Sequence, residues 1–135
     1  MIISTVARRL AAASLTAAAL AAPLLMSPTA HATTPDSRLF LTVSGSNNTW
    51  IRGVVLECPA TSGSNHPKAG EACAALDATG GDLDELPGDP RPCPHLYDPV
   101  TVTAEGQYDG RPVVWQRTFA NACVLTAVTG PVFRF

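Results

Sequence analysis

Short segments rich in apolar residues recur after residue 38, and their two-residue alternation predicts β-strands. They cover residues 39–43, 50–58, 100–104, 113–119 and 132–135. In the first, Leu39, Leu41 and Val43 share one face while Phe40 points the other way. Phe40 is therefore either covered by a loop or helix, or it is an exposed apolar contact through which two copies of the chain associate.

Two segments have helical character. Residues 69–79 contain good helix formers and end at Gly80-Gly81, a typical stop signal, and residues 120–127 predict a second, shorter helix. The acidic stretch 82–86 predicts a further helical turn with a solvated acidic face, because its carboxylates lack the spacing of an EF-hand calcium loop. Four or five antiparallel strands with one or two helices make an α+β domain.

The first 32 residues have the pattern of a signal peptide. Arg8 and Arg9 precede an apolar run over residues 10–26, and Ala30-His31-Ala32 supplies the small-x-small cleavage pattern. Pro23 interrupts the run, and a membrane-spanning helix needs about 20 apolar residues. We therefore expect cleavage after Ala32, secretion to the extracellular space and no membrane anchor, leaving residues 33–135 as one domain of 103 residues.

Charge and cysteine content narrow the class of protein. Residues 33–135 contain 7 basic and 11 acidic side chains, a formal net charge of −4 without a basic patch, so nucleic acid is not an expected partner. Four cysteines in a small secreted domain favour two disulfides, and three connectivities are open. A zinc site is not expected, because no C-x-x-C pair occurs and the domain has only two histidines. The cysteines are Cys58, Cys73, Cys93 and Cys123.

Catalytic signatures are absent from the sequence. It contains no G-x-S-x-G, H-E-x-x-H or phosphate-binding glycine loop, and paired cysteines leave no thiol nucleophile. His66 falls in a polar loop over residues 59–67, where a solvated or capping side chain is expected rather than a catalytic base. We expect neither enzyme activity nor a metal or organic cofactor.

Residues 90–100 predict a stiff, extended loop. Four prolines and Cys93 fall within these eleven residues, and each proline ring holds φ near the value of an extended chain. At the middle of the segment stands the pair His95-Leu96. A loop held extended in this way is suited to presenting that peptide bond to a protease.

Several spaced motifs resemble the Streptomyces subtilisin inhibitor family. They are Cys-Pro-x-x-Tyr-Asp-Pro-Val at 93–100, Thr-x-Gly-x-x-His-Pro at 61–67, Ala-Cys-Ala-x-Leu at 72–76, Gly-Gly-Asp-Leu at 80–83 and Val-Phe-x-Phe at 132–135. The resemblance covers nearly all of residues 33–135. It implies a disulfide-stabilised α+β fold with a five-stranded antiparallel sheet and two short helices, the disulfides Cys58–Cys73 and Cys93–Cys123, and a homodimer.

The resemblance also implies a function: inhibition of a serine protease by a substrate-like loop. It gives His95 as P1 and Leu96 as P1′ of the reactive bond. The remaining residues of the protease-contact loop are Arg91, Pro92, Cys93, Pro94 and Tyr97. By the same resemblance Pro92, Cys93 and Pro94 are P4, P3 and P2, and Tyr97 is P2′.

His95 departs from the family's commoner P1 residues, methionine, lysine and arginine. An imidazole is mostly neutral at pH 7 to 8, which suits the broad S1 pocket of a subtilisin-like protease better than the acidic pocket of a trypsin-like one. We therefore expect subtilisin-like targets, with trypsin-like or other serine proteases as the second choice. The alternative is a secreted binding or structural module that has the same scaffold and does not inhibit.

Overall fold

The computed structural model describes residues 27–29 and 37–135. The predicted signal peptide and its cleavage site lie almost entirely outside the described residues and stay predictions. The elements of the domain are β1 (Ser37–Ser44), a 3-10 turn η1 (Ser46–Asn48), β2 (Ile51–Cys58), α1 (Ala69–Asp77), β3 (Val100–Tyr108), β4 (Arg111–Phe119) and α2 (Ala122–Thr129). The domain is α+β, as the alternating segments predict.

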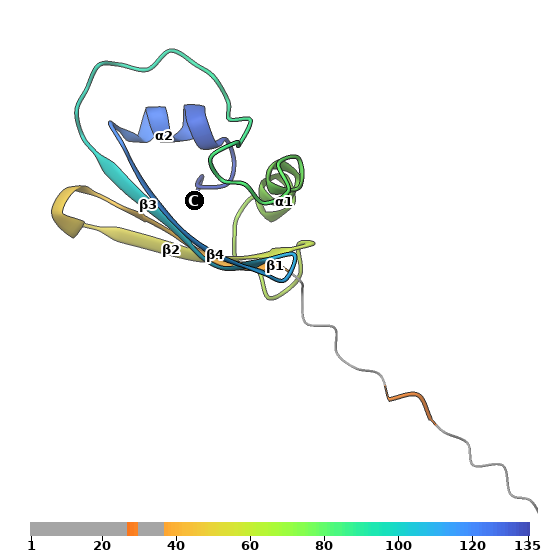
Figure 1. Cartoon of the computed structure of the whole chain (residues 1–135). Helices are drawn as coiled ribbons and strands as arrows, with labels where there is room; N and C mark the ends of the chain where they lie inside the picture. Colours follow the sequence, from red (N-terminus) through yellow and green to blue (C-terminus); the bar gives the residue numbers. More distant parts are fainter. Residues whose placement is uncertain (1–26, 30–36) are drawn as a thin grey trace, which may run out of the picture. The chain divides into compact units, whose positions relative to one another are not determined.

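The strands form one antiparallel sheet in the order β2-β1-β3-β4. Leu41 of β1 pairs with Val54 of β2 and Ala104 of β3. The apolar side chains at every second position of these strands lie on one face of the sheet. Both helices cover that face (Figure 1). Leu39, Leu41 and Val43 are buried there, as their spacing predicts, because the pleat sends alternate side chains to the same side.

The prediction of a fifth strand at residues 132–135 is wrong. This segment turns after Gly130-Pro131, with the Arg134 N–H donating to the Pro131 carbonyl at 3.2 Å, and it pairs with no strand of the described sheet. Val132 and Phe133 are buried, and Phe133 stacks on Trp115 with ring centroids 5.6 Å apart. The alternating apolar pattern therefore indicates only that these side chains are buried in the core. Side chains of a terminal turn can be buried as well as those of a strand.

The two helices lie close to their predicted places. α1 ends at Asp77, and the chain turns away at Gly80 and Gly81, which have φ of 61° and 85°; the Gly81 N–H donates to the Leu76 carbonyl at 2.9 Å. Left-handed glycines close a helix at low cost because they carry no Cβ. The expected helical turn at residues 82–86 is not formed; the Asp82 carboxylate instead accepts the Asp84 N–H at 2.9 Å in a local turn.

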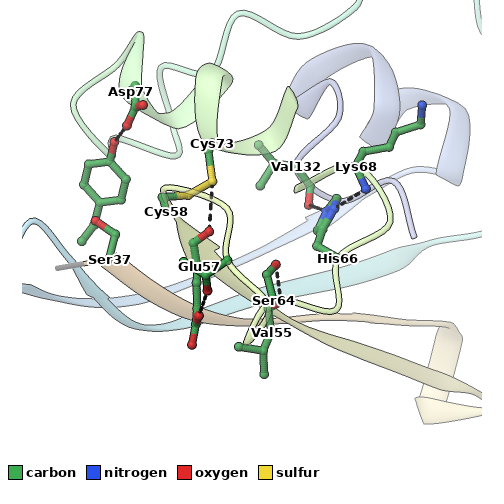
Figure 2. Close-up of a disulfide and its surroundings, with 12 residues drawn as sticks. Ser37, Val55, Glu57, Cys58, Ser64, His66, Lys68, Cys73, Asp77 and Val132 are labelled. Carbon is green, nitrogen blue, oxygen red and sulfur yellow. Dashed lines mark hydrogen bonds between the residues drawn. A yellow bond between two sulfur atoms is a disulfide. The ribbon is translucent and has the colours of Figure 1, made fainter. Parts of the chain in front are cut away.

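A disulfide between Cys58 and Cys73 links the end of β2 to α1 (Figure 2). At the C-terminal end of α1, the Tyr108 hydroxyl at the end of β3 donates to Asp77. Burial, followed by the hydrogen bond to Asp77, raises the pKa of Tyr108 above its ordinary value. The helix is thus attached to β2 by the disulfide and to β3 by the hydrogen bond, and these attachments add to what a small core alone provides.

His66 is buried, so the expectation of a solvated side chain is wrong, whereas its bond to the backbone of Lys68, just before α1, is of the expected capping kind. The residue is 5% exposed, and its ring lies between the backbone of Lys68 and that of Val132 (Figure 2). Its Nδ1 accepts the Lys68 N–H at 2.9 Å. Because a backbone N–H can only donate, Nε2 carries the proton and donates to the Val132 carbonyl at 2.9 Å. His66 therefore ties the loop before α1 to the chain after α2, a contact that the polar local sequence does not reveal.

We expect His66 to make the domain less stable in acid. Burial lowers the pKa of His66, an effect only partly opposed by its bond to Val132, so the unfolded chain takes up a proton more readily than the folded chain. The free energy of unfolding should be constant above about pH 6.5 and fall by up to about 1.4 kcal/mol per pH unit below it.

Thermal unfolding between pH 4.5 and 8 checks this, with His66→Gln as the comparison. The His66→Gln variant should be less stable than the wild type at pH 8. Its free energy of unfolding should also fall less on acidification, because it lacks the contribution of this ring. Equal pH profiles for the two proteins would contradict the assignment.

Candidate functional site: an extended loop held against α2

The segment between α1 and β3 contains the predicted protease-contact loop. It arches over α2 in Figure 1 and has no regular secondary structure from Asp89 to Pro99. Leu86 and Val100, near its two ends, are buried in the core, whereas Leu96 is 61% and Tyr97 80% exposed. The prolines keep the intervening chain extended, so the segment forms no helix between these two ends.

The structure keeps the predicted site residues together on this loop. Cys93 is half-buried, and the other six are exposed; these six are Arg91, Pro92, Pro94, His95, Leu96 and Tyr97. His66, in contrast, lies in the core. Leu96 and Tyr97, which are adjacent in the sequence, are both large hydrophobic side chains exposed to solvent.

Three contacts fasten the loop to the segment that begins at Ala120. The disulfide Cys93–Cys123, the other pairing implied by the resemblance, joins its middle to the first turn of α2, with Cα atoms 5.7 Å apart. The Asp89 N–H donates to the Ala127 carbonyl at 3.0 Å, and the Asp98 N–H donates to the Ala120 carbonyl at 2.9 Å. The loop is therefore anchored on both sides of the His95-Leu96 bond.

Asn121 supplies the contact nearest to that bond. Its Nδ2 donates to the Pro94 carbonyl at 3.3 Å and to the Leu96 carbonyl at 2.8 Å, the residues immediately before and after His95. Its Oδ1 accepts the Val124 N–H at 2.9 Å and so caps α2. The residue is 6% exposed. One buried side chain thus sets the spacing of the two carbonyls that bracket His95.

Sequence reasoning missed Asn121. The helix was expected to begin at residue 120, which placed this asparagine inside it, whereas it is the N-cap. Asparagine is a favoured N-cap, so this signal was available for the helix boundary. Its contacts with the loop were not, because they join residues 25 and 27 positions apart.

Few atoms support the loop besides these anchors. A hollow of about 310 Å³ lies under it, lined by residues that include Pro94, Leu96, Asn121 and Val124. The loop is therefore held at discrete points by a disulfide and hydrogen bonds rather than by continuous packing. Removing one of the hydrogen-bonded points should change the geometry of the His95-Leu96 bond more than the stability of the core.

Charged side chains hold the N-terminal end of the loop. Asp89 accepts hydrogen bonds from Arg91 and, at 3.2 Å, from Arg134 of the C-terminal segment. The bond from Arg91, and then that from Arg134, lowers the pKa of the Asp89 carboxyl below its usual range. The carboxylate is therefore ionised at neutral pH and links Arg91 to the chain after α2.

Within residues 27–29 and 37–135, no three His, Cys, Asp or Glu side chains gather closely enough to hold a metal ion. A search of the same residues for a helix with the length and hydropathy needed to cross a membrane found none.

Comparisons with known proteins identify the family of this chain. The sequence profile described as subtilisin inhibitor-like matches residues 35–121. Subtilisin inhibitor-like protein 5 of Streptomyces fradiae is 47% identical over 86 residues, which are 63% of this chain and 80% of that protein. The subtilisin inhibitor of Streptomyces albogriseolus is 39% identical over 130 residues, covering 92% of this chain and 88% of the other.

A solved structure is also similar. It is the complex of Streptomyces caespitosus sermetstatin with Bacillus licheniformis subtilisin, in which the similar chain is 40% identical and superposes with a TM-score of 0.58. The match covers 73% of this chain and 96% of that one. The chain therefore belongs to the subtilisin inhibitor-like family, a family of protease inhibitors rather than enzymes.

Proposed function

We propose that the chain is a substrate-like inhibitor of a serine protease of the subtilisin type and that His95-Leu96 is its reactive bond. The observation that carries this proposal is the clamp at Asn121: the carbonyls on either side of His95 are fixed, while the side chains of His95 and Leu96 are exposed. The subtilisin complex of a 40% identical protein supports the class of target.

The loop can dock as a substrate does. An extended segment offers backbone N–H and C=O groups for strand addition in a protease cleft, and a segment that is already extended loses little entropy on docking. The His95 side chain would then enter the S1 pocket, with Pro94, Cys93 and Pro92 on the nonprimed side and Leu96 and Tyr97 on the primed side. Arg91 would flank the nonprimed contacts.

The anchors explain why such a complex would persist. When the protease serine attacks the His95 carbonyl carbon, the C–N bond to Leu96 breaks and the Leu96 nitrogen takes a proton from the protease histidine. The new amine cannot diffuse away, because Asn121 holds the Leu96 carbonyl and Ala120 holds the Asp98 N–H. Reattack of the amine on the acyl-enzyme then restores the bond faster than water hydrolyses the ester.

Titration of subtilisin with the purified domain, followed by intact mass, tests the proposal. We expect stoichiometric loss of activity and slow cleavage confined to the His95-Leu96 bond. Full protease activity, with rapid digestion of the domain or without binding, would instead favour the non-inhibitory module.

Substitution of His95 tests its assignment as P1. We expect His95→Met to change the inhibition constant for subtilisin by about tenfold, and His95→Lys to add measurable inhibition of trypsin, because P1 fills the pocket that dominates specificity. Val114→Ala, which also removes exposed apolar surface but lies on β4 outside the loop, is the control and should leave the preference between the two proteases unchanged. If His95→Lys leaves that preference unchanged, His95 is not P1.

We also propose that the protein is secreted, with residues 1–32 removed as a signal peptide. Disulfides form and persist in oxidising compartments, and the domain has two of them. The mass of the protein recovered from culture medium should correspond to a chain that begins at Thr33. A mass that includes residues 1–32 would contradict the cleavage.

A homodimer through the open face of the sheet is a further part of the proposal. Phe40 lies on the face opposite the helices, is 49% exposed and covers Gly53 rather than being covered by a loop or helix. Val114 is 88% exposed on the same face. Exposed apolar side chains on an open sheet face suit contact with a second copy of the same chain, since a two-fold axis lets the face cover itself.

Sedimentation equilibrium of the domain should give twice the chain mass, and Phe40→Asp should give a monomer because a carboxylate is costly at an apolar interface. Glu105→Gln, which changes one charge on the same face, is the control for charge alone. A wild-type monomer at micromolar concentration would contradict the dimer.

A further inference from the structure

The turn between β1 and β2, residues 45–49, lies beside the loop at its C-terminal end. Ser44 pairs with Thr101 at the start of β3, so the turn and the loop lie at the same end of these two strands. The Ser46 hydroxyl donates to the Pro99 carbonyl at 3.3 Å. The β3–β4 turn at Asp109 and Gly110 lies at the opposite end of the strands.

The turn and Tyr97 enclose one hollow of about 670 Å³. Asn47 and Asn48, on its rim, are exposed, as is Tyr97. Thr101 and Thr118 line it from the sheet. The hollow is thus continuous with the primed side of the proposed reactive bond.

The lining of this hollow is polar and uncharged. Its side chains are hydroxyls, amides, the Tyr97 phenol and a proline. Such a surface has hydrogen-bond donors and acceptors and no net charge, so it suits a neutral polar segment of a partner.

The turn is also held in one conformation. Gly45 N–H donates to the Trp50 carbonyl at 3.0 Å, and Asn48 N–H donates to the Gly45 carbonyl at 3.1 Å. Asn47 and Asn48 adopt φ of 54° and 55°, which asparagine tolerates better than most residues. A turn closed by its own backbone bonds loses little freedom when a partner covers it.

We propose that residues 45–49 are a second protease-contacting surface, which together with Tyr97 receives an uncharged polar loop from the primed side of the bound protease. This inference rests on the proposed function, because a protease that holds Leu96 and Tyr97 in its primed subsites extends past Tyr97 over the hollow. Proteases that differ in the loop bordering their primed subsites are then bound with different affinities by the turn, independently of His95.

The inhibition constant for subtilisin of variants with added charge tests whether the turn contacts the protease. Asn47→Asp combined with Asn48→Asp keeps residues that accept left-handed φ and adds two carboxylates to the neutral surface. We expect the inhibition constant to rise by about tenfold or more, because charges buried without partners at an interface oppose binding. Asn48→Gly, which removes only a side chain, should give a smaller rise.

Gly110→Asp is the matched control. It adds a carboxylate to a left-handed turn, at φ 71° and with open space around the new Cβ, at the far end of the sheet. Its inhibition constant should stay within about twofold of wild type. Melting temperatures of all variants separate loss of contact from loss of fold.

Hydrogen exchange on the unmodified complex with subtilisin gives an independent measurement. Amides of residues 46–49 should exchange more slowly in the complex than in the free domain, and those of residues 109–110 should not change. If the wild type inhibits but exchange at 46–49 is unchanged, or the aspartate pair behaves as Gly110→Asp does, the inference is overturned. If the wild type does not inhibit at all, the proposed function fails first and the inference fails with it.

Discussion

Asn121→Asp is expected to weaken inhibition of subtilisin about a hundredfold. Aspartate has the shape of asparagine and still accepts the Val124 N–H, so the cap of α2 survives. The Nδ2 donor is replaced by an oxygen that faces the carbonyls of Pro94 and Leu96. Each unpaired group costs about 1 to 3 kcal/mol, and about 3 kcal/mol in total corresponds to a hundredfold change.

The inhibition constant and the rate of cleavage at His95-Leu96 measure this effect. Cleavage should accelerate, because the Leu96 amine is no longer held in place for religation. Asn65→Asp is the matched control: its Oδ1 accepts the Val55 N–H at 2.6 Å, away from the loop, and aspartate keeps that acceptor. An Asn121→Asp protein that inhibits as tightly as the Asn65→Asp protein would rule out a positioning role for Asn121.

Removing the Cys93–Cys123 disulfide is expected to convert the inhibitor into a substrate. With both cysteines changed to serine, the nonprimed half of the loop loses its covalent attachment to α2 while the hydrogen bonds at Asn121 and Ala120 remain. The cleaved ends then separate more often than they religate. We expect complete cleavage within the time in which the wild type stays intact, and inhibition weakened by about a hundredfold or more.

Removal of the other disulfide, Cys58–Cys73, distinguishes the effect of loop rigidity on inhibition from the effect of domain stability. The chain-entropy model gives about 3 to 4 kcal/mol for either crosslink, with sequence separations of 15 and 30 residues. The Cys58→Ser, Cys73→Ser protein should therefore melt at a similarly reduced temperature. Assayed well below that temperature, it should still inhibit. Equal loss of inhibition in both double variants would mean that overall stability, and not the loop anchor, decides the outcome.

Local patterns were sufficient for most of the architecture. The alternation at residues 39–43 predicted the buried face of β1, and Gly80-Gly81 predicted the end of α1, since both depend on the backbone conformations of neighbouring residues. The same pattern failed at residues 132–135, because alternation records which side chains are buried and not whether a strand is available for pairing.

The sequence by itself determined the α+β class, the positions of the helices and four strands, and the extended loop around His95, because proline geometry and residue periodicity act within a few residues. Only the tertiary structure decided that His66 is buried, that the terminal segment is a turn, and that Asn121 donates to the carbonyls of Pro94 and Leu96, the residues on either side of His95. It also decided that residues 45–49 lie beside Tyr97. These features join residues far apart in the chain, as His66 and Val132 are, 66 positions apart. Such contacts depend on how the whole domain packs, and no local pattern encodes them.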